Sequence, residues 1–190
     1  MVKLFKAMVI AILMMLLPVE PISAQQGKME TFETNGFTFV VKDITKPDAS
    51  ATVTRTTLSG NIVIPPTVEW KGRNYNVTNI AQHFIHSQYS AKPTYKTVTS
   101  ITLPSTIKSI ETGAFGVSEV LTEIKIQGEN NFFTVQDGIL YNKDKTTLVY
   151  CPCQIDATNF SFPSTVKELS GNAFSKNILK SITIPKHIIK

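Results

Sequence analysis

The chain has 190 residues, of which 42% are hydrophobic and 17% are charged, and it carries a formal net charge of +5. This composition predicts a folded chain with room for one domain and a small second element, and it excludes an intrinsically disordered protein. The basic residues are scattered without a run or stripe, which argues against a nucleic-acid-binding protein.

Residues 1–24 have the three-part order of a secretory signal peptide. Lys3 and Lys6 form a positive start, residues 7–17 are an unbroken apolar run, and small residues end the segment at Ala24. The apolar run has eleven residues, fewer than the ~20 that a membrane-spanning helix needs. We therefore expect cleavage after Ala24 and a secreted or cell-surface protein. No Cys stands directly after the run, so a lipid anchor is not expected.

Residues 25–60 precede the repeated part of the chain and predict an N-terminal β-cap. Two segments, 36–41 and 51–58, alternate apolar and polar residues as half-buried strands do. Residues 43–50, which include Pro47, connect them. We expect these two strands to cover the first repeat.

Residues 61–190 repeat a pattern in which an alternating apolar segment is followed by Pro and a second apolar half. The clearest copy spans residues 98–115, and residues 159–174 match it at a constant offset of 59. Looser or partial copies occupy residues 61–68 with 77–84, residues 121–126 and residues 179–188. Pro163 and Pro185 are 22 residues apart, within the 20–29 residues typical of leucine-rich repeats.

One repeat cannot bury its apolar side chains alone, so stacked repeats are expected to form ladders. The first predicted row is Ile62, Ile101, Ile124, Phe160 and Ile182, and the second is Ile64, Leu103, Ile126, Phe162 and Ile184. Phe84, Phe115 and Phe174 are expected to stack on the convex side. The last copy stops after its first half, so its apolar face is expected to lack a neighbour and to fray or self-associate.

The repeats resemble the BspA-like leucine-rich repeats, whose unit reads approximately Leu-x-x-Ile-x-Ile-Pro-x-x-Val-x-x-Ile-x-x-x-Ala-Phe. The resemblance covers residues 61–190 and implies a mainly β leucine-rich-repeat solenoid, incomplete at its C-terminus. Residues 133–152 fit the family's inserted β-hairpin, which the sequence places around the polar turn 142–145. Many family repeats have Gly after the second Ile, whereas this chain has Glu111, Ser170 or Ala81 there.

No motif for catalysis, cofactor binding or metal binding is present, and the sequence predicts that the protein is not an enzyme. His83 and His86 lack a third ligand. Asp137-Gly138 predicts a turn rather than a calcium loop, because the spacing of an EF-hand is absent. Cys151 and Cys153 alternate along an extended segment, so we expect two free thiols, one inward and one near the surface.

The resemblance implies a protein-binding or adhesion module that contacts a host or microbial protein or glycoprotein. The alternative is a structural spacer within a larger surface protein, with no ligand of its own. Neither nucleic acid nor a membrane span after signal cleavage is expected.

The candidate partner-binding residues flank the central apolar residue of each strand and therefore point out of the sheet. They are Asn61, Val63, Ser100, Thr102, Glu123, Lys125, Asn159, Ser161, Ser181 and Thr183. Most are small and polar, which suits a contact surface but equally suits any exposed, twisted sheet.

Overall fold

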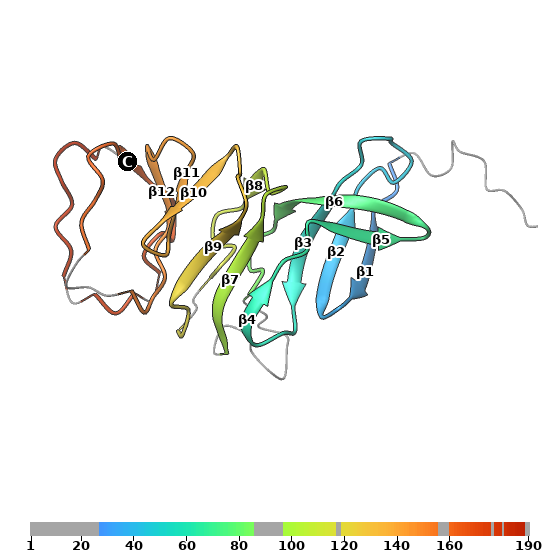
Figure 1. Ribbon diagram of the computed structural model, residues 1–190, viewed down its shortest axis with the longest axis horizontal. Coiled ribbons are helices and arrows are strands. Elements are labelled where there is room, and N and C mark those ends of the chain that lie inside the picture. Colours follow the sequence, from blue (N-terminus) through green and yellow to red (C-terminus); the bar gives the residue numbers. More distant parts are fainter. Residues whose placement is uncertain are drawn as a thin grey trace, which may run out of the picture.

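The computed structural model describes residues 27–85, 97–116, 119–155, 160–175, 177–179 and 181–188. Within these ranges the protein is mainly β, with thirteen strands and no helix (Figure 1). The predicted signal peptide lies outside them. A search of the same residues for a helix long and apolar enough to cross a membrane finds none.

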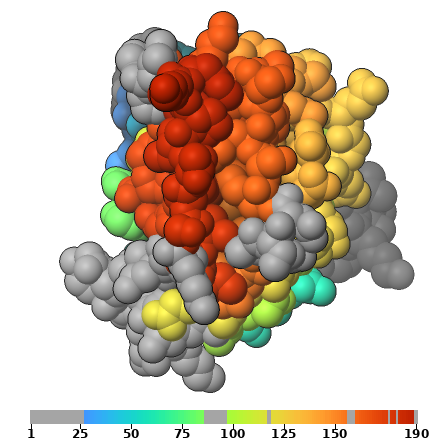
Figure 2. Space-filling model, turned by 90° about the vertical axis from the view of Figure 1, so that its left-hand side faces the viewer, coloured from blue at the N-terminus to red at the C-terminus, as the bar shows by residue number. Residues whose placement is uncertain are grey.

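The strands run broadly in chain order along the long axis of the molecule, except that the β5–β6 hairpin returns to the end where β1 and β2 lie (Figure 1). Their bounds are β1 Glu30–Thr34, β2 Phe37–Val41, β3 Ala51–Thr56, β4 Gly60–Val63, β5 Thr67–Trp70, β6 Arg73–Ile80, β7 Val98–Pro104, β8 Ser109–Ile110, β9 Glu123–Gln127, β10 Phe133–Gln136, β11 Ile139–Asn142, β12 Thr147–Tyr150 and β13 Glu168–Leu169. The described residues between 160 and 188 lie at the far end, and Figure 2 shows that end face on.

The N-terminal sheet has the order β1-β2-β3-β6-β5, and β8 also pairs with β6. Strands β2 and β3 lie where the sequence predicts strands, whereas β1 was not predicted. Phe37, Phe39 and Val41 alternate inward on β2 and are buried. A tight turn lies at Lys71-Gly72, where positive φ values of 51° and 73° close the β5–β6 hairpin.

A parallel three-stranded sheet, β4-β7-β9, contains the first predicted ladder. Ile62, Ile101 and Ile124 are in register and buried. In the second row, Leu103 is in register with Ile126, and Ile64 donates its backbone N–H to the carbonyl of Thr102. The ladder prediction is therefore confirmed for the first three strand copies.

The ladder prediction is wrong for the last two copies. Phe160 and Phe162 are half-buried and lie outside the strands, while Ile182 and Ile184 are 36% and 53% exposed. The reason is that the chain after β9 does not continue the sheet with another repeat strand. Instead the β10–β11 turn occupies the next position, where the Ile124 N–H donates to the carbonyl of Gly138.

The second halves of the repeats also pair in parallel. Asn79 and Ile80 of β6 lie opposite Ser109 and Ile110 of β8. On the other side β6 is parallel to β3, and further along the chain β13 is parallel to β12. Phe84 and Phe115 are buried, as expected for this part of the repeat. Phe174 is half-buried and packs edge-on against Phe160 and Phe162.

Strands β10, β11 and β12 form an antiparallel meander that contains the predicted hairpin. The polar turn connects β11 to β12 as predicted, and Asp137-Gly138 makes a second tight turn between β10 and β11. Cys151 and Cys153 are free thiols, but both are fully buried, so the expectation of a surface cysteine is wrong. Cys153 is held inside because its thiol contacts the Leu121 carbonyl at 3.6 Å.

Candidate functional site

The predicted contact residues form two rows across β4, β7 and β9, called here the strand strip. Asn61, Ser100 and Glu123 are in register, and so are Val63, Thr102 and Lys125. Asn61, Val63 and Lys125 are exposed, while Thr102 and Glu123 are half-buried. The other predicted residues lie outside this sheet: Ser161, Ser181 and Thr183 are exposed, and Asn159 lies outside the described residues.

Ser100 does not point into solvent as predicted, because only 6% of it is exposed. Its hydroxyl donates to Asn61 Oδ1 at 3.0 Å, and Thr99 Oγ1 donates to the same oxygen at 3.0 Å. A small side chain between two longer neighbours is covered by them. Glu123 and Lys125 also meet, with an ion pair of 2.6 Å. The polar groups of the strand strip therefore hold one another in fixed positions.

A cavity of about 560 Å³ opens beside this sheet, between β9 and the β10–β11 turn. We call it the meander cavity. Its lining residues are Thr122, Glu123, Gln136, Asp137, Gly138, Ile139, Tyr141, Gln154, Ile155, Phe160 and Ser161. Glu123 and Ser161 are also predicted contact residues, so the cavity adjoins the strand strip. Polar side chains make up more of this lining than apolar ones, and polar groups that converge on a concave site can orient a bound ligand.

The polar groups of the meander cavity are held by local contacts. Lys145 Nζ donates to Gln136 Oε1 at 2.7 Å, and Gln136 Nε2 approaches Asp137 Oδ2 at 3.4 Å. Gln154 Nε2 donates to the Glu119 carbonyl at 2.9 Å. Burial, with a smaller contribution from nearby negative charge, raises the pKa of Tyr141 to about 12. The Tyr141 phenol is therefore neutral at physiological pH, and only 2% of this residue is exposed.

Gly138 brings the β10–β11 turn against β9. Its φ of +78° is a left-handed conformation that suits glycine. A Cβ at this position would come within 3.2 Å of Glu123 Cβ. The absence of a side chain thus allows the close approach that forms one wall of the meander cavity.

The chemistry of the cavity suits binding. Carboxylate, amide and hydroxyl groups face it together with the aromatic residues Tyr141 and Phe160, a combination that can accept a polar peptide or sugar segment. Of the predicted histidine pair, His83 is exposed and His86 lies outside the described residues. Within those residues no group of three or more His, Cys, Asp or Glu side chains could hold a metal ion.

Sequence reasoning missed most of the meander cavity. It identified Asp137-Gly138 as a turn and Glu123 and Ser161 as surface residues, but it did not bring them together. The available signal was the Asp-Gly pair between two alternating segments, which is a strong marker of a tight hairpin. Gln136, Tyr141 and Gln154 carry no such signal, because their positions depend on how the meander packs against β9.

A family profile described as a BspA type leucine-rich repeat region (6 copies) matches residues 89–190. A search of curated proteins gives no match. Similar solved structures include a leucine-rich repeat protein from Bacteroides ovatus, with 23% identity, 83% of this chain and 36% of that chain covered, and a TM-score of 0.47. A leucine-rich cell surface protein from Faecalibacterium prausnitzii is 18% identical, with 85% of this chain and 50% of that chain covered and a TM-score of 0.46. The pneumococcal vaccine antigen PcpA is 16% identical, with 82% of this chain and 64% of that chain covered and a TM-score of 0.37. This chain thus spans between 36% and 64% of the length of these structures.

Proposed function

This chain belongs to the BspA-type leucine-rich repeat family, and from that membership we propose that it is an exported protein-binding or adhesion module. Repeats of this type are typically interaction modules rather than enzymes. The partner is a protein or glycoprotein of host or microbial origin, bound outside the cell or at its surface. The signal-peptide pattern of residues 1–24 supports this location.

The proposal includes the architecture that presents the binding surface. Residues 61–190 form a leucine-rich-repeat solenoid, and strands within residues 25–60 cap its first repeat. Support comes from the parallel pairing of β4, β7 and β9 and from the parallel pairing of β3 with β6. The pairing of β3 with β6 adds an N-terminal strand to the row in which β6 and β8, the second halves of two repeats, lie side by side.

The observation that carries the proposed function is the meander cavity beside the strand strip. A regular repeat surface of small polar side chains binds weakly, since each hydrogen bond contributes only ~0.5–1.5 kcal/mol net. A concave site of about 560 Å³ can enclose part of a partner and exclude water from those bonds. The strand strip and the meander cavity together form one continuous contact surface, with Glu123 as the shared residue.

Binding of a partner tests this function. The purified chain is measured by surface plasmon resonance against a panel of purified extracellular glycoproteins and against intact bacterial cells. For a partner that binds, Lys125→Glu in the strand strip and Asp137→Lys in the meander cavity are expected to weaken binding at least about tenfold, because each reverses a charge in the contact surface. Thermal unfolding confirms that each variant is folded.

Asp144→Lys is the matched control. It makes the same charge change as Asp137→Lys at an exposed position on the β11–β12 turn, away from the cavity lining. If Asp144→Lys alone weakens binding, the proposed contact surface is wrong. If nothing in the panel binds, a structural spacer within a larger surface protein is the better function.

A further inference from the structure

A second cavity, of about 450 Å³, lies between β1 and the β5–β6 hairpin. We call it the basic cavity. Its lining residues are Lys28, Glu30, Ile44, Trp70, Lys71, Arg73 and Tyr75. Three of them are cations and one is a carboxylate, so the lining has a net charge of +2 when all four are ionised. None of these residues belongs to the strand strip or the meander cavity.

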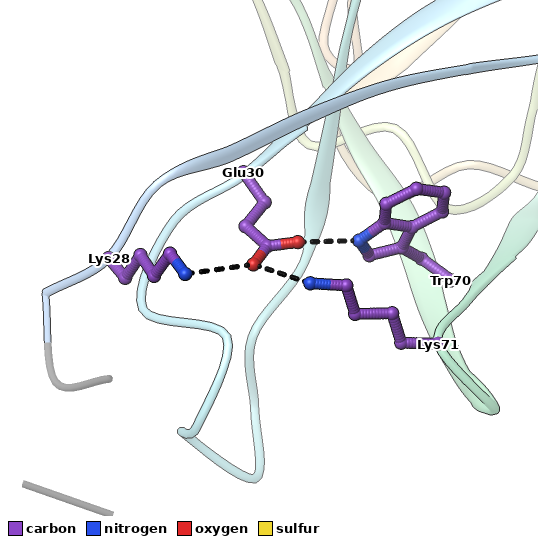
Figure 3. A network of polar contacts seen from close by, with 4 residues as sticks. All are labelled: Lys28, Glu30, Trp70 and Lys71. Carbon is purple, nitrogen blue, oxygen red and sulfur yellow. Dashed lines mark hydrogen bonds and ion pairs between the residues drawn. The ribbon is translucent and has the colours of Figure 1, made fainter. Parts of the chain in front are cut away.

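Glu30 organises the cations of the basic cavity (Figure 3). Its Oε1 accepts a hydrogen bond from Lys71 Nζ at 2.8 Å and lies 3.6 Å from Lys28 Nζ. Its Oε2 accepts a hydrogen bond from Trp70 Nε1 at 2.7 Å. The hydrogen bond from Lys71 is the largest of the effects that lower the pKa of Glu30. Because two ammonium groups meet at one carboxylate oxygen, they are held close together.

The exposure of these groups differs. The Glu30 side chain is 10% exposed, whereas the side chains of Lys28 and Lys71 are 58% and 60% exposed. The carboxylate is thus an inner anchor, and both ammonium groups remain open to solvent. A single lysine is sufficient to neutralise Glu30, so the second is available for an external anion.

The remaining walls of the basic cavity are fixed. The Arg73 guanidinium lies 5.0 Å from the centre of the Tyr75 ring and donates to backbone carbonyls of the β2–β3 loop, including that of Ile44 at 2.7 Å. The Trp70 ring stacks on Phe32, with centroids 4.3 Å apart and an interplanar angle of 4°. Of the three cations only Arg73 is fixed by these walls, so its charge contributes to the cavity while Lys28 and Lys71 supply the ammonium groups open to a ligand.

We propose that the basic cavity binds a dianionic oxyanion group, a sulfate or phosphate ester. The charge of such a group matches the net charge of the lining. Its oxygens accept the charge-assisted hydrogen bonds that ammonium groups donate, and these are stronger than neutral ones. The site is additional to the proposed partner surface and gives the chain a second recognition point, selective for anionic ligands.

Trp70 makes the test direct, because it is the only tryptophan in the chain and its indole N–H belongs to the network. Its fluorescence is followed while sodium sulfate or sodium phosphate is added at constant ionic strength, with sodium chloride as the reference salt. We expect a saturable change with either dianion and none with chloride. The affinities in the sulfate and phosphate titrations identify which ester the site prefers.

Lys28→Gln and Lys71→Gln are each expected to raise the dissociation constant for the dianion about three- to tenfold, because each removes one partly exposed charge contact. Lys108→Gln is the control, since it removes one positive charge at an exposed position outside the lining. Because Lys71→Gln can alter the fluorescence of Trp70 by itself, the rise in melting temperature with added sulfate is measured as a second signal. Equal binding by Lys71→Gln and the unaltered chain, or equal loss in Lys108→Gln, would overturn the proposal.

Discussion

At the scale of single residues, Gly138 determines how closely the meander approaches β9. The substitution Gly138→Ala places a side chain on a left-handed backbone, at a cost of about 1–2 kcal/mol, and forces Glu123 to move. We expect the free energy of unfolding to fall by more than this backbone cost. Urea denaturation measures the change.

Gly72 provides the comparison for Gly138. It occupies the same position of the β5–β6 turn with φ +73°, yet a Cβ there would meet no atom within 4 Å. Gly72→Ala should therefore show the backbone cost alone. Equal destabilisation by the two substitutions would mean that the contact with Glu123 contributes nothing.

The buried thiol of Cys151 predicts a loss of stability in alkali. Burial raises its pKa to about 12 in the folded protein, whereas an unfolded thiol titrates near ~8.5. The stabilisation of the folded state by the neutral, buried Cys151 thiol is therefore fully present below about pH 8.5, and it is lost as the pH rises toward the folded pKa. The free energy of unfolding should fall with pH by up to about 1.4 kcal/mol per unit for this group.

Urea denaturation between pH 7 and pH 10.5 would show this decline. Cys151→Ala removes the titrating group, so the free energy of unfolding of this variant should fall less steeply over the same pH interval. Some slope should remain, because burial also raises the pKa values of Cys153 and Tyr141. A slope that does not change in Cys151→Ala would show that Cys151 does not contribute.

At the scale of elements, Asn130 connects the meander to the repeat that precedes it. Its Nδ2 donates to the carbonyls of Ser105 and Ile107 at 3.0 and 2.7 Å, and its Oδ1 accepts the backbone N–H groups of Phe132 and Phe133. The residue is almost fully buried. One side chain thereby satisfies four backbone groups that link the turn after β7 with the start of β10.

Asn130→Ala should lower the free energy of unfolding by about 2–3 kcal/mol, because it leaves buried backbone groups without partners. The neighbouring Asn131 is exposed, and Asn131→Ala is expected to change stability by less than about 0.5 kcal/mol. Thermal and urea unfolding of the two variants test this difference. Similar stabilities for both variants would be inconsistent with a connecting role for Asn130.

The elements that sequence predicted well are those with strong local patterns. Alternation at Phe37 and Phe39 located β2, and the repeat register correctly aligned Ile62 with Ile101 and Ile124. β1 was missed because only Phe32 in its Glu30–Thr34 segment is a large apolar residue, and its partners lie in other strands. The meander cavity and the Glu30 network were missed for the same physical reason. Each joins residues from distant segments whose contacts depend on packing rather than on local pattern.

At the scale of the whole molecule, the two proposed sites are formed by strands at different places along one elongated body (Figure 1). The basic cavity is formed by β1, β5 and β6, whereas the meander cavity is formed by β9, β10 and β11. The two sites therefore use different elements and share no lining residue. A partner long enough to reach both sites would bind with a higher overall affinity than at either site alone.

The far end of the molecule exposes apolar residues and should be its least stable part. Ile178, Ile182 and Ile184 are each at least 36% exposed, and residues 181–185 belong to no strand. Backbone amides without sheet hydrogen bonds exchange quickly. Hydrogen exchange measured by mass spectrometry should therefore be fast in residues 181–188 and slow in β7. Slow exchange throughout residues 181–188 in a monomer would contradict this expectation.

The same exposed isoleucines should promote association between copies of the chain, since exposed apolar side chains favour burial against another surface. Replacing both Ile182 and Ile184 with Thr is expected to shift the sedimentation of concentrated protein toward monomer. Val63→Thr is the control, because Val63 is as exposed as Ile184 but lies on the strand strip. If Val63→Thr reduces association as much as the double substitution does, the far end is not the contact, and the copies associate through the sheet face.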